Sequence, residues 1–177
     1  MDEKILIITN RSDYTADVVV KRLRERAVGF LRFNTEDFPL RTLVSVRIAG
    51  ERTYLRLESD KWRMDQDDVK SVWYRRPVLP NLEGANLSEN DRQFAVRESA
   101  EVTQSLWRLL RHKLWITQPD ILRLVETKAL QLKKAVELGF SVPDTLISNN
   151  SDEVRSFYRI HNGNVVVKPI SHGGYGE

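Results

Sequence analysis

KILIIT, residues 4–9, is an uninterrupted apolar run of strand length, and it decides how the start of the chain is interpreted. Strands that are buried on both faces, as in parallel sheets, have this composition. Asn10, Ser12 and Asp13 follow it with side chains that favour turns and cap helix N-termini. A helix is therefore predicted from about Tyr14 to Arg26, directly after the first strand.

The segment after this helix completes a strand–helix–strand unit. AVGFLRFN, residues 27–34, predicts a second strand that ends near Asn34. The connection between two such strands is almost always right-handed, which implies a parallel pair. LVSVRIAGERTYLRLE, residues 43–58, instead predicts a β-hairpin that turns around residues 49–52. SVWYRRP, residues 71–77, predicts a further strand that ends in two arginines and a proline.

A long helix is predicted from the capping-box-like SEND, residues 88–91, to about Lys113. Its predicted buried stripe consists of Phe94, Val102, Leu106, Leu109 and Leu110. LWIT, residues 114–117, predicts a short strand, and the break at Gln118-Pro119 predicts a domain boundary. Residues 1–118 are thus expected to form an α/β domain, a small, open, largely parallel sheet with flanking helices.

Residues 119–177 are expected to form a second, α+β domain. Val125, Ala129, Leu132 and Val136 recur at the spacing of one helical face, and Gly139 follows where a C-terminal cap glycine belongs. Three shorter elements are then predicted: a strand around residues 145–147, a helix at 152–160 and a strand at 164–168.

The composition excludes several classes of protein. The 28 Lys and Arg and the 25 Asp and Glu are interspersed, so the clustered basic patch of a nucleic-acid-binding protein is missing. The first apolar run is too short for a signal peptide or a membrane span. The chain has no cysteine, and neither its three histidines nor the acidic DQDD, residues 65–68, shows the spacing of a metal site. These features predict a cytoplasmic protein that binds neither nucleic acid nor membrane.

The last residues, VVVKPISHGGYGE (165–177), suggest a phosphate-binding segment. A lysine supplies a point charge, and glycines allow backbone N–H groups to approach an anion closely. The Walker A loop has the opposite order, with its glycines ahead of the lysine, so this segment is not a P-loop. Local composition alone leaves a frayed glycine-rich tail as the alternative.

The final third resembles the nucleotide-binding half of the ATP-grasp ligases. Four phrases carry the resemblance in order: ETKALQLKKAVELGF, SVPDTLIS, NVVVKP and ISHGGYG, residues 126–176. The resemblance implies that Lys128 and Lys168 contact the phosphates of ATP. Backbone N–H groups in the glycine-rich segment would cover these phosphates, at Ser171, Gly173, Gly174 and Gly176. Thr127 departs from the family, which often has Asn or Asp at that position.

Arg75 and Arg76 are the candidate substrate-binding residues. They end a predicted buried strand, and open α/β sheets bind ligands outside the carboxyl ends of their strands. The planar fork of arginine suits a carboxylate or a phosphate, so the pair can hold an acidic substrate side chain or the reacting phosphate. Surface ion pairs made by two loop arginines are the alternative.

RFNTEDFP, residues 32–39, and VWYRRP, residues 72–77, are similar to the leading domain of the microviridin-type (graspetide) ribosomal peptide maturases. The resemblance implies a pre-ATP-grasp, Rossmann-like domain followed by part of an ATP-grasp domain. It implies an ATP-dependent ligase that activates a peptide side-chain carboxylate as an acyl phosphate for attack by a hydroxyl or an amine. The partner would be a ribosomally made precursor peptide, and a homodimer is left open.

In that family the adenine-hinge residues and the ligands of Mg²⁺ lie beyond the glycine loop. We therefore expect the 177-residue chain by itself to lack ligase activity and to bind ATP weakly, whether it is a fragment or a natural short form. No catalytic residue and no metal ligand is assigned within it. The alternative is a non-catalytic α/β module that binds a peptide or a partner protein through Arg75 and Arg76.

Overall fold

The computed structural model describes residues 4–170, and the chain divides into two compact units, Met1–Pro119 and Asp120–Glu177. The main sheet of the first unit is parallel and has four strands. In spatial order these strands are β2 (Phe30–Asn34), β1 (Lys4–Thr9), β6 (Val69–Tyr74) and β7 (Leu114–Ile116). The strand predicted from KILIIT therefore lies inside the sheet, which is why its residues 5–8 are all apolar.

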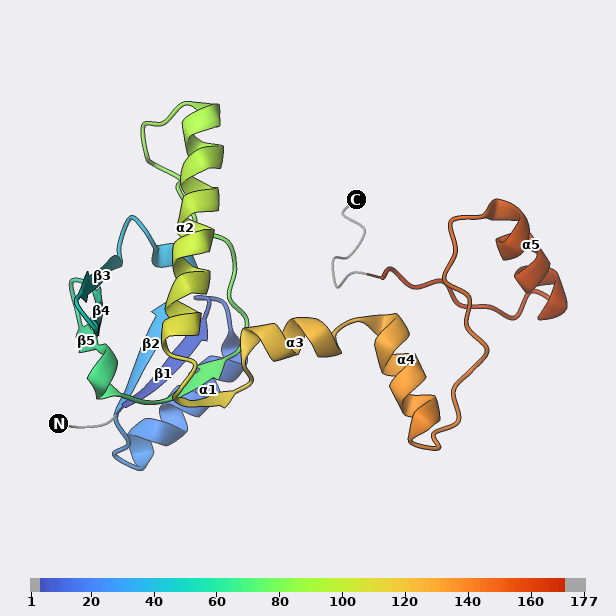
Figure 1. Ribbon diagram of the computed structural model, residues 1–177, viewed down its shortest axis with the longest axis horizontal. Helices are drawn as coiled ribbons and strands as arrows, with labels where there is room; N and C mark the ends of the chain where they lie inside the picture. The colour runs from blue at the N-terminus through green and yellow to red at the C-terminus, as the bar shows by residue number, and fades with distance from the viewer. Residues whose placement is uncertain (1–3, 171–177) are drawn as a thin grey trace. The chain divides into compact units, whose positions relative to one another are not determined.

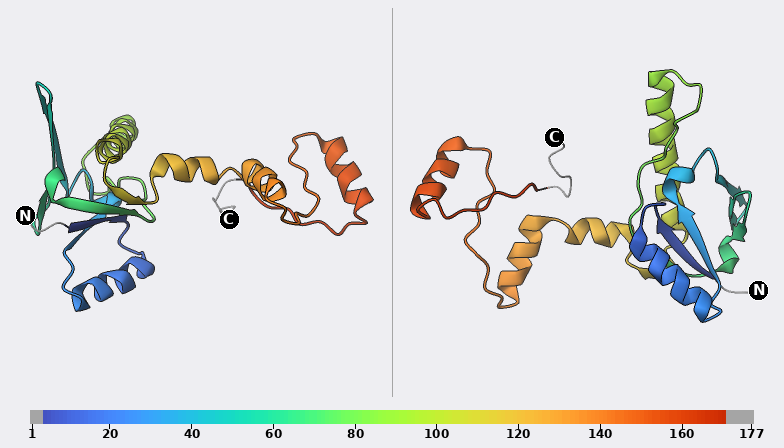
Figure 2. Two further views of the ribbon diagram at one scale, coloured as in Figure 1. Left: turned by 60° about the horizontal axis from the view of Figure 1, so that its bottom comes forward. Right: turned by 180° about the vertical axis from the view of Figure 1, so that it is seen from behind.

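Helices cover both faces of this sheet (Figures 1 and 2). Ile7 of β1 packs with Ala16 and Val20 of α1 (Tyr14–Glu25) on one face. Leu6 and Ile8 point to the other face, where α2 (Glu89–Leu109) packs. The predicted α/β class, with a small parallel sheet and flanking helices, is confirmed.

A small antiparallel sheet lies on the α2 side and consists of β3 (Leu43–Ala49), β4 (Arg52–Glu58) and β5 (Arg63–Asp65). The predicted hairpin is confirmed, because Ala49 pairs with Arg52 and leaves Gly50 and Glu51 as a two-residue loop. Gly50 has φ 60°, a left-handed conformation that glycine adopts without strain. β5 was not predicted from the sequence.

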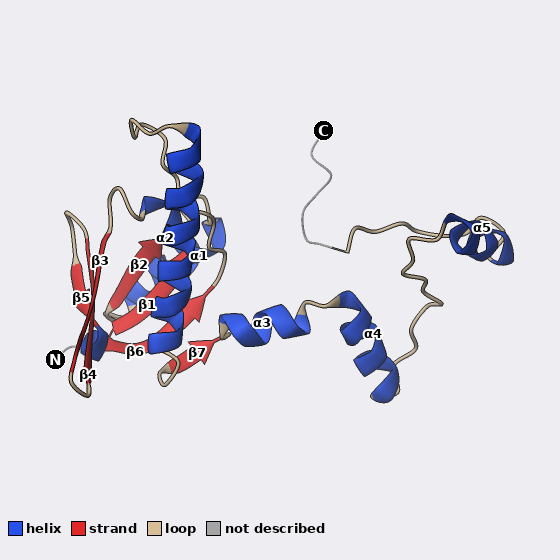
Figure 3. Ribbon diagram, turned by 45° about the horizontal axis from the view of Figure 1, so that its top comes forward, coloured by secondary structure: helices blue, strands red, loops and turns tan. Residues whose placement is uncertain are grey.

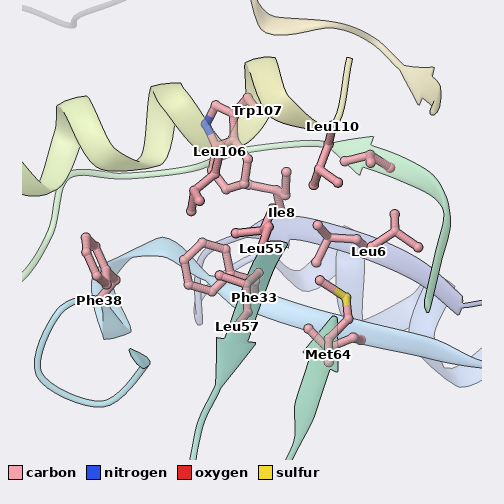
Figure 4. Packing of buried hydrophobic residues seen from close by; sticks show 13 residues of the cluster. Leu6, Ile8, Phe33, Phe38, Leu55, Leu57, Met64, Leu106, Trp107 and Leu110 are labelled. Carbon is pink, nitrogen blue, oxygen red and sulfur yellow. The ribbon is translucent and has the colours of Figure 1, made fainter. Parts of the chain in front are cut away.

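The core of the first unit forms between the main sheet, the small sheet and the C-terminal half of α2 (Figure 4). Leu55, Leu57 and Met64 reach it from the small sheet. Phe33 is fully buried and meets the ring of Trp107 edge-on, with the ring centroids 5.9 Å apart.

The predicted buried stripe of α2 is only half right. Leu106 and Leu110 are buried, but Phe94 is 58% exposed and Val102 36% exposed. The N-terminal half of α2 extends beyond the strands (Figure 3), so its apolar side chains have no sheet to pack against. The helix begins as predicted, since Ser88 Oγ accepts the N–H of Asp91 at 3.2 Å, but it ends at Leu109 rather than near Lys113.

The second unit contains α3 (Pro119–Val125, which starts at the boundary), α4 (Lys128–Glu137) and α5 (Ser151–Ile160). Gly139, with φ 81°, ends α4 as predicted. The strands predicted around residues 145–147 and 164–168 do not form, because neither segment has a hydrogen-bonded partner strand among the described residues. Within residues 120–170 no side chain is buried. This part of the chain therefore has no hydrophobic core of its own.

Candidate functional site

The sheet places two loops at its topological switch point. β1 leads into α1 on one face, and its neighbour β6 leads towards α2 on the opposite face. Open α/β sheets bind ligands where adjacent strands diverge in this way, outside their carboxyl ends. Residues 10–13 follow β1, and Arg75 and Arg76 follow β6. We call Asn10, Asp13, Arg75 and Arg76 the switch-point site.

Backbone contacts fix the two arginines to the loop after β1. The N–H of Arg75 donates to the carbonyl oxygen of Ile8 at 2.9 Å, which extends the pairing of β1 with β6 by one residue. The Asn10 side-chain amide donates to the carbonyl oxygen of Arg76 at 2.6 Å. The backbone positions of both arginines are therefore fixed by hydrogen bonds.

Asp13 is the buried acid of this site, with a side chain that is 1% exposed. It caps α1 by accepting the N–H of Ala16 at 3.3 Å, and it accepts the hydroxyl of Thr9 at 2.7 Å. Burial acts to raise the pKa of Asp13, but these hydrogen bonds and the charges of Arg75 and Arg76 together hold that pKa below its ordinary value. Asp13 is therefore charged at neutral pH.

The two arginines differ in their partners. The Nε of Arg75 lies 3.9 Å from Oδ2 of Asp13, and the Arg75 side chain is 28% exposed. Arg76 is exposed, and no carboxylate in residues 4–170 forms an ion pair with it. The sequence predicts the same role for both arginines, whereas in the structure Arg75 forms an ion pair and Arg76 forms none with a described carboxylate.

The RFNTEDFP segment supports the switch-point site from β2. The Arg32 guanidinium donates to the carbonyl oxygen of Asn10 at 2.6 Å, and its Nε donates to Asn34 Oδ1 at 2.9 Å. Thr35 Oγ1 donates to the carbonyl oxygen of Val78 at 2.7 Å and accepts the N–H of Val78 at 2.8 Å. The RFNTEDFP segment is therefore hydrogen-bonded to Asn10 of the switch-point site and to Val78, the residue that directly follows VWYRRP.

The acidic character of Asp13 yields a prediction about stability. Because its pKa is lower in the folded than in the unfolded chain, its stabilising contribution is present above about pH 4 and is lost as the pH falls through the folded value. We expect acidification from pH 7 to about pH 3 to lower the free energy of unfolding less in Asp13→Asn than in the wild type. Tryptophan fluorescence in urea measures this for the first unit alone, because the four tryptophans are Trp62, Trp73, Trp107 and Trp115. An equal loss in both proteins would contradict the prediction.

The two candidate nucleotide-binding lysines lie in the second unit. Lys128 is the first residue of α4, and its amino group donates to the carbonyl oxygen of Pro169. Lys128 therefore contacts the residue that follows Lys168, and the Lys168 side chain itself is exposed. Lys133 and Lys134 pair with Glu137 on the surface of α4, as expected of solvated helix charges.

The remaining predicted phosphate contacts, at Ser171, Gly173, Gly174 and Gly176, lie outside the described residues. No group of three or more His, Cys, Asp or Glu side chains within residues 4–170 could hold a metal ion. In the DQDD segment, Asp65 pairs with Arg56 at 2.7 Å, and Asp68 accepts the backbone N–H of Asp65. None of the described helices is long and apolar enough to cross a membrane.

Comparison with known proteins gives a consistent result. The family described as the MvdD pre-ATP grasp domain matches residues 4–123. Among curated proteins no match was found. The solved macrocyclase MdnB from Microcystis aeruginosa is 30% identical, with a TM-score of 0.82 over 91% of this chain and 52% of MdnB.

Two further solved structures are similar. A RiPP-associated ATP-grasp ligase from Chryseobacterium gregarium, in complex with ADP and a leader and core peptide, is 26% identical, with a TM-score of 0.81 over 90% of this chain and 48% of the ligase. The macrocyclase MdnC from M. aeruginosa, bound with its precursor peptide MdnA, is 24% identical, with a TM-score of 0.87 over 98% of this chain and 57% of MdnC, and supports the fold alone. The chain thus spans about half the length of these relatives.

Proposed function

Because the chain belongs to the MvdD pre-ATP-grasp domain family, we propose that it forms the N-terminal part of an ATP-dependent carboxylate ligase. The ligase would activate a side-chain carboxylate of a ribosomally made peptide, and a hydroxyl or an amine of that peptide would then form the crosslink. The observation that carries the proposal is the switch-point site, where an unpaired Arg76 lies at the carboxyl end of a parallel strand.

Peptide binding is supported by the charge and the position of this site. An exposed guanidinium with fixed backbone suits a carboxylate, since it offers paired N–H donors in a planar fork. The ligase from C. gregarium and the macrocyclase MdnC are both complexes with their peptides. For this chain we infer a precursor peptide with acidic side chains as the substrate.

Nucleotide binding is assigned to the second unit. Bound ATP would supply the phosphoryl group that activates the carboxylate. Lys128 and the segment of Lys168 are brought together by the contact with Pro169, and two lysines fit the charge of a triphosphate. The oxygen ligands that Mg²⁺ requires are not clustered within residues 4–170, so we propose that they lie in other polypeptide.

The exposed apolar surface of the second unit is consistent with a larger ATP-grasp domain. A groove of about 590 Å³ runs along α3 and α4, and its lining includes Leu124, Leu130, Leu138 and Phe140. Phe140 is 67% exposed. The relatives are about twice as long as this chain, and we propose that polypeptide equivalent to their remaining half covers this groove.

Replacement of the lysines tests the nucleotide assignment. In the protein made from the complete reading frame, we expect Lys128→Ala and Lys168→Ala each to weaken ATP binding by roughly 10-fold or more, because a charge-assisted contact to phosphate is lost. Calorimetric titration with ATP measures the effect. Lys133→Ala is the matched control on α4, since Lys133 pairs with Glu137. ATP affinity that is unchanged in both variants would refute the assignment.

The function itself is tested by incubating that complete protein with its precursor peptide, ATP and Mg²⁺. We expect mass spectrometry to record the loss of one water for each bond formed, and no loss when ATP is omitted. The 177-residue chain alone is expected to bind ATP weakly, and micromolar affinity would contradict this. If the complete protein binds the peptide but never links it, the chain is a peptide-binding module instead.

A further inference from the structure

We infer that the switch-point site binds a single carboxylate through Arg76, and that Asp13 is a positioning residue that holds Arg75 and cancels its charge. The inference deepens the proposed function and rests on it for the identity of the ligand as a peptide side chain. It separates two ligands that the sequence left open, a carboxylate and a phosphate.

The first step is the pairing of Arg75 with Asp13. Asp13 Oδ2 lies 3.9 Å from Arg75 Nε, and the Asp13 side chain is 1% exposed. The carboxylate also accepts the hydroxyl of Thr9 and the N–H of Ala16, so its position is fixed from both β1 and α1. A ligand that recruits Arg75 must therefore break the ion pair of a buried carboxylate, which is unfavourable.

The second step is the freedom of Arg76. Its carbonyl oxygen is held by Asn10, but its side chain is exposed and has no carboxylate partner among the described residues. The nearby cations Arg32 and Arg11 are already paired, with Asp17 and Asp37 respectively. Arg76 is thus the arginine of the switch-point site that remains available for an anion.

The third step is the sum of the charges. Asp13 contributes one negative charge, and Arg75 and Arg76 contribute two positive charges, so the site carries one net positive charge. One carboxylate neutralises this charge. A phosphate dianion would bring a second negative charge close to Asp13, and like charges at short range in a partly buried site repel strongly. The geometry therefore favours a carboxylate.

The test uses the 177-residue chain with acetate and inorganic phosphate as probes, followed by NMR of the arginine Nε–H groups. In the wild type we expect acetate to shift the Arg76 signal and not the Arg75 signal, and phosphate to bind no more tightly than acetate. Asp13→Asn keeps an N-cap and removes the charge. It should raise phosphate affinity by about 10-fold and bring the Arg75 signal into the response.

Two further variants separate position from charge. Arg75→Gln lowers the net charge of the site to zero and should weaken the binding of both anions. Asp13→Asn combined with Arg75→Gln restores one net positive charge, so its phosphate affinity should return to the wild-type value. Glu25→Gln is the matched control, because Glu25 lies at the far end of α1 and pairs with Arg22.

The outcomes are decisive in either direction. The inference is overturned if acetate leaves the Arg76 signal unchanged, if wild-type chain prefers phosphate, or if Asp13→Asn leaves the relative affinities unaltered. Failure of the complete protein to link a peptide would remove the ligase assignment and leave this anion selectivity standing. Anion binding and peptide ligation therefore fail independently.

Discussion

Phe33→Ala is expected to lower the free energy of unfolding of the first unit by about 3–5 kcal/mol. Phe33 is fully buried, with a relative solvent exposure of 0%. Its ring contacts Trp107 edge-on and lies within the cluster that joins both sheets to α2 (Figure 4). Truncation removes this contact and leaves a cavity that the surrounding strands cannot fill. Urea unfolding followed by tryptophan fluorescence measures the loss.

Phe94→Ala is the matched control for this prediction. It makes the same chemical change on α2, but Phe94 is 58% exposed, and alanine has the higher helix propensity. We expect a change within about 0.5 kcal/mol. Equal destabilisation by the two substitutions would mean that the N-terminal half of α2 is packed against other protein.

The comparison of Phe33 with Phe94 shows how far apolar periodicity predicts structure. KILIIT and the hairpin sequence specify their elements locally, through a buried run and a glycine turn, and these predictions are confirmed. Periodicity on a helix indicates which side is apolar but not how far the sheet beneath it extends. Phe94 and Val102 are exposed, although the same periodicity assigns them to one stripe with the buried Leu106.

A similar limit explains the second unit. The segments around residues 145–147 and 164–168 have strand composition, but a strand forms only when another strand pairs with it. No partner exists within residues 120–170, and both segments stay irregular. The caps and turns of this unit, such as Gly139 after α4, need only local contacts and were predicted correctly.

Sequence reasoning located the arginines of the switch-point site but not their environment. A polar residue at the end of an apolar strand can be recognised from the sequence alone, and so can a helix cap such as Asp13. The pairing of Asp13 with Arg75 joins positions 62 residues apart in the sequence, because β1 and β6 are neighbours only in the sheet. The signal that could have found it is the strand order, which local patterns do not contain.

This pairing gives the adjacent arginines opposite mutant phenotypes, which is the second large effect we predict. In the protein made from the complete reading frame, Arg76→Ala should lower kcat/KM for peptide ligation by roughly 10- to 100-fold, the usual cost of one charge-assisted hydrogen bond. The fluorescence-monitored free energy of unfolding should not change, because Arg76 is exposed and forms no ion pair with a described carboxylate.

Arg75→Ala should instead destabilise the first unit, by about 1–3 kcal/mol, because it removes the cation that forms the ion pair with the buried charge of Asp13. Arg97→Ala, which removes an exposed arginine from α2, serves as the control for both measurements. If Arg76→Ala unfolds the protein, or Arg75→Ala slows ligation without loss of stability, the roles of the two arginines are reversed. If Arg76→Ala leaves both ligation and stability unchanged, the peptide carboxylate is bound elsewhere, and the switch-point site is a structural feature of the sheet.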